Sequence, residues 1–259
     1  RGQLERLARL GKLPDHVAVG TATDPYQPLE AKARLTRGCL EVLAEFGVPF
    51  SVTTRSPLVL RDLDILRAAP ASTVNISLHT LDTEIWRRFE PASPPPRRRL
   101  QAAGRLAEAG VPVHVFVAPV LPYLTDSAEG AAELAEACRE RGVRGVMVDI
   151  LELATPEVKV WFFAALRRHY PELAPLYGRL YHRSSRPPES YRGPVRRRLE
   201  AEFAKRGLMK SNGAPKLHEG GAEQGGTDRR PGSSAGPNAV SGPGCERPAA
   251  CTPLQLTLF

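Results

Sequence analysis

The segment VHVFVAPV, residues 113–120, is the clearest indication of the fold class, because its apolar residues are almost continuous and do not alternate with polar ones. A strand of this composition is typically buried on both faces, as in a parallel sheet. Four more short runs of this kind occur in the sequence, and a longer helical pattern follows each of the five. The predicted strands are His16–Thr21, Pro49–Thr54, Thr73–His79, Pro112–Ala118 and Arg144–Leu151.

The segments between these strands have the 3.6-residue spacing of apolar side chains that amphipathic helices show. The pattern is clearest in Leu29–Phe46 and Leu100–Ala109, and Asp82 and Asp126 are the predicted N-caps of two helices. Repeated strand–helix units predict an α/β fold, either a parallel β/α barrel or a doubly wound open sheet. Both architectures place functional residues at the carboxyl ends of the strands.

Polar side chains gather where the first three predicted strands end. The first strand runs into GTATDPYQP, residues 20–28, whose glycine and prolines stop both helix and strand. A single Ser or Thr at such a place is most often a helix cap, but a rigid loop with so many polar groups favours a ligand site. We expect this loop to display the side chains of Thr21, Thr23, Asp24, Tyr26 and Gln27. The next two strands are expected to bring Arg55, Ser77 and His79 to the same rim.

Four prolines and a tract of three arginines follow the third strand, in FEPASPPPRRRL, residues 89–100. Here Glu90 has two possible roles. It neutralises a cationic group of a ligand, or it pairs with one of Arg97 to Arg99, in which case an exposed pair contributes little to stability.

Length and composition are those of one barrel-sized domain, since 259 residues with 42% hydrophobic content can bury a core. No apolar run approaches the roughly 20 residues of a membrane span, so we expect a cytoplasmic protein without a membrane partner. The cysteines Cys39, Cys138, Cys245 and Cys251 stand at no spacing known for zinc or iron–sulfur ligation. The sequence therefore predicts no metal ligands among these residues.

Positive charge is concentrated near the end of the predicted barrel. Residues 161–210 contain 12 Lys or Arg and 4 Asp or Glu, and this surplus of eight equals the whole net charge of +8. Such a concentration attracts polyanions. The predicted contacts to DNA or RNA are Arg192, Arg196, Arg197 and Arg198, and the alternative is an arginine-rich surface that is merely solvated.

By composition the chain divides into four parts. We expect a partial β/α barrel over residues 1–155 and a helical basic extension over 156–210. Residues 211–253, rich in Gly, Pro and Ser, predict a disordered tail because they offer little apolar surface to bury. A short apolar peptide, 254–259, ends the chain.

The terminal peptide resembles the QL-x-LF sequence by which bacterial DNA polymerases and repair proteins bind the sliding clamp. The matching residues are Gln255, Leu256, Leu258 and Phe259. An apolar group at the end of a polar tether is typical of docking peptides. The peptide therefore predicts the sliding clamp as a partner, and the alternatives are an added edge strand or a frayed end.

Seven motifs occur in the order and spacing of the radical S-adenosylmethionine (SAM) proteins that resemble spore photoproduct lyase. They are GTATDPYQP, LTRGCLEVL, TTRSPLVLRDLDIL, VNISLHTLD, FEPASPPPRRRL, LAEAGVPV and VAPVLPYLTD. The resemblance covers roughly residues 1–207. It implies a partial barrel that holds a [4Fe-4S] cluster and SAM. It also implies reductive cleavage of SAM to a 5′-deoxyadenosyl radical, which takes a hydrogen atom from a substrate.

Carried over by position, the resemblance implies that Thr23 and Asp24 contact the methionine end of SAM. Arg55 meets the SAM carboxylate, and Ser77 lies near that carboxylate or the ribose. Thr21 is the remaining residue of the predicted SAM-binding set. In the true spore photoproduct lyases the equivalent position is a cysteine that returns a hydrogen atom to the product radical. Because a threonine O–H bond is too strong for that role, we do not expect repair by the lyase mechanism.

The CxxxCxxC motif that binds the cluster in this family is absent from the sequence. Because the chain begins with Arg1 inside a helical pattern, we expect a βα unit with the motif to precede it. We also expect the chain by itself to be inactive.

Two alternatives remain: a cluster-free barrel module that binds nucleic acid, and a β/α-barrel enzyme unrelated to SAM. The latter would use strand-end Thr and Asp residues with His79 for a metal or phosphate.

Overall fold

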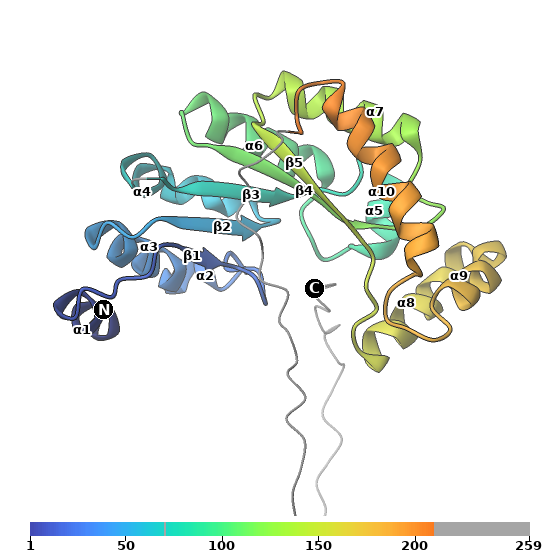
Figure 1. The fold of residues 1–259 in the computed structure, drawn as a ribbon, viewed down its shortest axis with the longest axis horizontal. Coiled ribbons are helices and arrows are strands. Elements are labelled where there is room, and N and C mark those ends of the chain that lie inside the picture. The colour runs from blue at the N-terminus through green and yellow to red at the C-terminus, as the bar shows by residue number, and fades with distance from the viewer. Residues whose placement is uncertain (70, 210–259) are drawn as a thin grey trace, which may run out of the picture. The chain divides into compact units, whose positions relative to one another are not determined.

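The computed structural model describes residues 1–69 and 71–209, which contain a five-stranded parallel sheet with helices packed against it (Figure 1). The sheet order is β1-β2-β3-β4-β5, so that each strand pairs with the next one along the chain. The predicted α/β fold with a parallel sheet is confirmed. The strands are β1 (Val17–Val19), β2 (Phe50–Thr54), β3 (Thr73–Ser77), β4 (Val113–Val120) and β5 (Gly145–Ile150).

Helices connect the strands and continue after the last one. Those up to β5 are α1 (Gly2–Arg9), α2 (Glu30–Ala33), α3 (Leu35–Glu45), the 3₁₀ helix η1 (Pro57–Asp62), α4 (Leu63–Ala68), α5 (Thr83–Phe89), α6 (Pro96–Glu108) and α7 (Ala128–Glu140). Those after β5 are α8 (Pro156–His169), η2 (Pro171–Leu173), α9 (Ala174–Leu180) and α10 (Glu189–Ala204). None of these described helices is long and apolar enough to cross a membrane.

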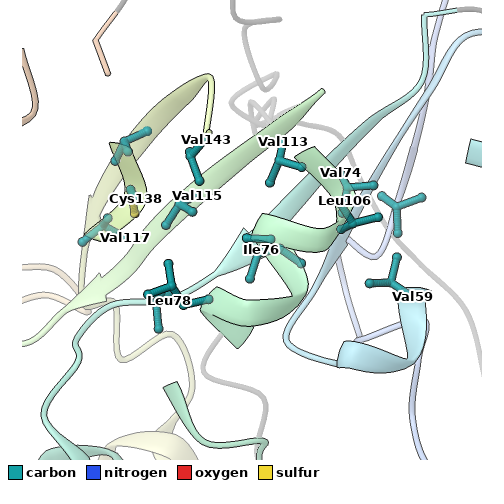
Figure 2. Packing of buried hydrophobic residues seen from close by; sticks show 14 of the residues in the cluster. Val59, Val74, Ile76, Leu78, Leu106, Val113, Val115, Val117, Cys138 and Val143 are labelled. Atoms are coloured by element: carbon teal, nitrogen blue, oxygen red, sulfur yellow. The ribbon is translucent and has the colours of Figure 1, made fainter. Parts of the chain in front are cut away.

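One face of the sheet packs against helices and forms the main hydrophobic core (Figure 2). Val113, Val115 and Val117 of β4 lie on this face, because alternate side chains of a strand point the same way. Leu106 of α6 and Cys138 of α7 belong to the same cluster. The opposite face carries polar side chains among the apolar ones. Asn75 and Ser77 of β3 lie on it, and Ser77 is the last residue of that strand.

The predicted helix Leu29–Phe46 is in fact two helices, α2 and α3, separated by Arg34, whose φ of 51° is left-handed. The Glu30 carboxylate accounts for the break. It accepts hydrogen bonds from the backbone N–H groups of Thr36 (3.1 Å) and Arg37 (3.3 Å). The first turn of a helix leaves such groups without intrahelical partners, so a side chain of α2 starts α3.

Of the two predicted N-caps, one is correct and one is wrong. Asp82 caps α5, and its carboxylate accepts from two backbone N–H groups of the first turn. The cap of α7 is Ser127, not Asp126. Asp126 instead accepts a hydrogen bond from the Tyr191 hydroxyl over 2.6 Å, and this bond joins the start of α7 to α10.

The helices after β5 pack in two places. α8 and α9 belong to a second cluster rich in aromatic rings, in which Phe162 of α8 stacks on Phe89 of α5 with 5.2 Å between ring centroids. α10 lies against α7 and β5 and contributes Val195, Leu199 and Phe203 to the main core. The late helix α10 therefore completes the barrel core.

After α10 the chain passes along the outer edge of the sheet. The backbone N–H of Val146 in β5 donates to the carbonyl oxygen of Leu208 over 3.0 Å. The predictions for the tail 211–253 and for the clamp-type peptide with Gln255, Leu256, Leu258 and Phe259 lie outside the described residues.

Candidate functional site

The carboxyl ends of β1, β2 and β3 meet at one edge of the sheet, because parallel strands end on the same side. The chain leaves β1 through Gly20, whose φ is +91°. A Cβ atom on this residue would lie 2.3 Å from the carbonyl oxygen of Thr53 in β2. Glycine therefore allows the loop after β1 to pass close to the backbone of β2.

Asp24 fixes this loop against the end of β2. Its Oδ1 accepts hydrogen bonds from the Thr54 hydroxyl (2.7 Å) and from the backbone N–H of Tyr26 (2.8 Å). Its Oδ2 accepts from the backbone N–H of Arg55 over 2.8 Å. The structure thus brings two of the predicted site residues, Asp24 and Arg55, into direct contact.

The other loop residues differ in their exposure. Thr21, Thr23 and Gln27 are exposed, as predicted. The prediction that Tyr26 is displayed is wrong, because its side chain is buried and its hydroxyl donates to Oδ2 of Asp62 over 2.9 Å. Asp62 is fully buried and also accepts hydrogen bonds from two arginines. This buried network holds the loop after β1 against η1.

Arg99 of α6 is a buried hub at the end of β3. Its side chain donates to the carbonyl oxygens of Ser77 (3.1 Å) and Pro94 (2.7 Å). Its Nη2 donates to Oε2 of Glu90 over 2.6 Å, and Oε1 of Glu90 accepts from Nε of Arg55 over 3.3 Å. Contacts therefore connect the predicted residues Ser77 and Arg55. Glu90 has the arginine partner expected of it, but the pair is buried and not exposed.

The charges around Glu90 keep it ionised. Burial alone would raise the pKa of this carboxyl group, but interactions with His79, which is charged only at low pH, and with Arg99 and Arg55 lower the pKa to about 2. His79 is also buried, with Nδ1 3.8 Å from Oε1 of Glu90 and no hydrogen bond to either ring nitrogen. Burial, opposed by Glu90 and assisted by the arginines, lowers the pKa of His79 to about 4. Its imidazole is therefore neutral at pH 7.

The state of His79 predicts how stability depends on pH. Between the ordinary pKa of 6.5 and the folded value of about 4, the unfolded chain binds a proton that the folded chain does not. Stability contributed by neutral His79 is therefore present above pH 6.5 and is lost as the pH falls toward 4. We expect a loss of about 2 kcal/mol between pH 7 and pH 5.

Urea unfolding of the His79→Leu variant at both pH values measures this effect. The variant should lack most of the pH-dependent loss seen in the wild type. His169→Gln changes an exposed histidine at the end of α8 and serves as the control. An equal loss in wild type and His79→Leu contradicts the assignment.

The four predicted nucleic-acid contacts all lie on α10, where Arg196, Arg197 and Arg198 are exposed. Three of the four are in ion pairs, which the composition had not indicated. The pairs are Arg192 with Glu189 (2.9 Å), Arg196 with Asp149 (3.5 Å) and Arg198 with Asp126 (3.8 Å). Of these pairs, Arg196 with Asp149 joins two exposed side chains, and an exposed pair of this kind contributes little energy.

The described residues do not fit a [4Fe-4S] cluster. Within residues 1–69 and 71–209, no three His, Cys, Asp or Glu side chains are arranged to hold a metal ion. Cys39 is exposed on α3, while Cys138 is buried on α7, where burial raises the pKa of the thiol to about 12.

The strand edge does fit the amino-acid end of SAM, which carries both a carboxylate and an ammonium group. The guanidinium of Arg55 suits the carboxylate, because its planar fork can donate parallel hydrogen bonds. The Asp24 carboxylate and the exposed Thr23 hydroxyl offer oxygen acceptors for the ammonium group.

The fold and its polar edge define an α/β protein of the class that binds ligands at the carboxyl ends of parallel strands. The family model described as the radical SAM superfamily matches residues 2–135. The chain belongs to the radical SAM superfamily.

Its relatives include uncharacterised proteins. The chain is 39% identical over 192 residues to the uncharacterised protein Rv2578c of Mycobacterium tuberculosis, with 73% of this chain and 56% of the relative covered. It is 29% identical over 110 residues to an uncharacterised protein of Methanocaldococcus jannaschii, with 42% of each covered. The chain thus spans about half the length of the curated relatives it matches.

A solved structure of a spore photoproduct lyase mutant is similar to this chain with a TM-score of 0.54. The match covers 78% of this chain and 62% of the lyase at 14% sequence identity. At that identity the likeness concerns the fold, and it confirms a partial barrel of the radical SAM type. The narrower resemblance to the spore photoproduct lyase family stays a prediction.

Proposed function

We propose that this chain forms the SAM-binding part of a radical SAM enzyme. The observation that carries the proposal is the joining of Asp24 to the backbone of Arg55 at the carboxyl edge of the sheet. This arrangement occurs in a chain that belongs to the radical SAM superfamily. It holds a cation and hydrogen-bonding oxygens close together, as the zwitterionic end of SAM requires.

In this proposal Arg55 binds the SAM carboxylate, Thr23 and Asp24 contact the methionine end, and Thr21 is a further SAM-binding residue of the same loop. Ser77 lies near the carboxylate or the ribose. The superfamily implies reductive cleavage of SAM with a [4Fe-4S] cluster, and the described part of the chain supplies no ligands for that cluster. The roles proposed for these residues are binding and orientation of SAM.

SAM binding tests the proposed site directly. In the full-length protein, Asp24→Ala and Ser77→Ala are each expected to weaken SAM binding by about 1–3 kcal/mol, the cost of leaving a buried hydrogen-bonding group unpaired. Equilibrium dialysis with labelled SAM measures the affinity, and formation of 5′-deoxyadenosine under anaerobic reduction measures the activity.

Ser72→Ala is the matched control for Ser77→Ala. Ser72 is buried just before β3, and its hydroxyl donates to the Leu66 carbonyl far from the carboxyl edge. This variant should lose stability but keep its SAM affinity. Unchanged affinity in both Asp24→Ala and Ser77→Ala would refute the placement of the site.

A nucleic acid is the substrate class that we propose, on the basis of α10. Arg196, Arg197 and Arg198 are exposed at successive positions of this helix, within the segment that carries the whole net charge. Arginines that neutralise phosphates release condensed counterions, so binding weakens linearly with the logarithm of salt concentration. A barrel module that binds nucleic acid without catalysis would use the same surface.

Charge reversal on α10 tests this substrate class. The double variant Arg196→Glu/Arg197→Glu is expected to bind a DNA duplex more weakly and to reduce the salt slope by about two. Arg97→Glu/Arg98→Glu makes the same change at two exposed positions of α6 and is the control. If both variants give the same slope as wild type, α10 is a solvated surface.

A further inference from the structure

Glu90 connects two guanidinium groups that come from different parts of the fold. Its Oε2 lies 2.6 Å from Nη2 of Arg99, and its Oε1 lies 3.3 Å from Nε of Arg55. The side chains of Glu90, Arg99 and Arg55 are 6%, 1% and 13% exposed. Because water screens such a cluster weakly, each of these charges strongly affects the position of the next.

Arg99 is held in place by the backbone as well as by Glu90. Its Nε donates to the Pro94 carbonyl over 2.7 Å, and its Nη1 donates to the Ser77 carbonyl over 3.1 Å. Arg99 therefore gives Glu90 a fixed partner, and the second oxygen of Glu90 is directed toward Arg55.

Arg55 is in turn fixed at both ends. Asp24 accepts from its backbone N–H, while Glu90 accepts from its side-chain Nε. A guanidinium has five N–H donors, and a bidentate carboxylate uses two of them. The hydrogen bond from Nε to Glu90 therefore fixes the plane of the guanidinium group.

We infer that Glu90 is a positioning residue, which holds the Arg55 guanidinium at the carboxyl edge in the orientation that binds a ligand carboxylate. The inference rests on the proposed function, in which Arg55 meets the carboxylate of SAM. A long arginine side chain that is fixed before the ligand arrives loses less conformational freedom on binding. Without the Glu90 charge, Arg55 and Arg99 would repel each other, and the orientation of the Arg55 guanidinium would be less restricted.

The test compares two ligands that differ only in the carboxylate, SAM and decarboxylated SAM, on the full-length protein. Glu90→Gln is expected to weaken SAM binding about tenfold, the usual effect of losing one charge-assisted hydrogen bond. It should leave the affinity for decarboxylated SAM nearly unchanged. Arg55→Ala should show the same selectivity, and the double variant should be no weaker than Arg55→Ala.

Glu84→Gln is the matched control, since it makes the same substitution at an exposed position of α5. Equal weakening of both ligands by Glu90→Gln would show a merely structural role and overturn the inference. If Glu90→Gln does not fold, Glu90→Asp keeps the charge but shortens the side chain, and the same selective loss is expected.

The same measurements separate this inference from the proposed function. A wild type that binds neither ligand overturns both. A wild type that prefers SAM, together with a Glu90→Gln variant that keeps the full preference, overturns only the role of Glu90.

Discussion

Replacing Arg99 by methionine is expected to lower the free energy of unfolding by about 3–5 kcal/mol. The substitution keeps much of the side-chain volume but leaves the buried Glu90 carboxylate without its closest cation. It also removes the donors to the carbonyl oxygens of Ser77 and Pro94. Urea unfolding followed by circular dichroism at pH 7 measures the change.

Arg98→Met is the control, because Arg98 is the exposed neighbour on the same helix. An exposed substitution of this kind should change stability by no more than about 0.5 kcal/mol. Equal effects of the two variants would mean that the Arg99 network contributes no more than an exposed arginine.

Gly20→Ala is expected to be the second severe change. An alanine at φ +91° would pay about 1–3 kcal/mol for its backbone conformation. In addition, its Cβ would meet the Thr53 carbonyl oxygen at 2.3 Å and Cδ of Pro25 at 2.7 Å. The loop would have to move away from β2, so we expect both a lower melting temperature and weaker SAM binding.

Gly47→Ala isolates the steric part of this effect. Gly47 also has a positive φ, of 64°, but a Cβ there would have no heavy atom within 4 Å. Its replacement should therefore show the cost of the backbone conformation without the overlap. A Gly20→Ala variant as stable as Gly47→Ala would contradict the close approach of the loop to β2.

Local patterns were enough to predict the five strands but not every boundary, since the first strand was predicted over His16–Thr21 and spans only Val17–Val19. The continuous apolar run at residues 113–120 predicts β4, because a strand that is buried on both faces needs apolar residues at consecutive positions. The break at Arg34 was missed, since it depends on the Glu30 carboxylate reaching Thr36 and Arg37. A helical repeat of apolar residues carries no signal for such a contact.

The candidate site was predicted in outline only. Sequence order placed Asp24, Arg55 and Ser77 at neighbouring strand ends, but the network behind them joins residues far apart in the chain. The sequence did not show which of the three arginines at 97–99 pairs with Glu90. In the structure it is Arg99, because that position of α6 faces inward. Likewise, the sequence predicts that Tyr26 is exposed in its loop, whereas in the structure its buried hydroxyl donates to Asp62, 36 residues along the chain.

The place of α10 in the core has a consequence for synthesis of the protein. A ribosome releases the sheet from its N-terminal end, and β5 emerges well before Val195, Leu199 and Phe203 are available to cover it. Leu208, which accepts from the outer edge of β5, arrives later still. Until that point the nascent chain exposes apolar surface and an unpaired strand edge, both of which favour aggregation. Chaperone capture of the growing chain is therefore expected to last until about residue 209 has left the exit tunnel and to end once α10 docks.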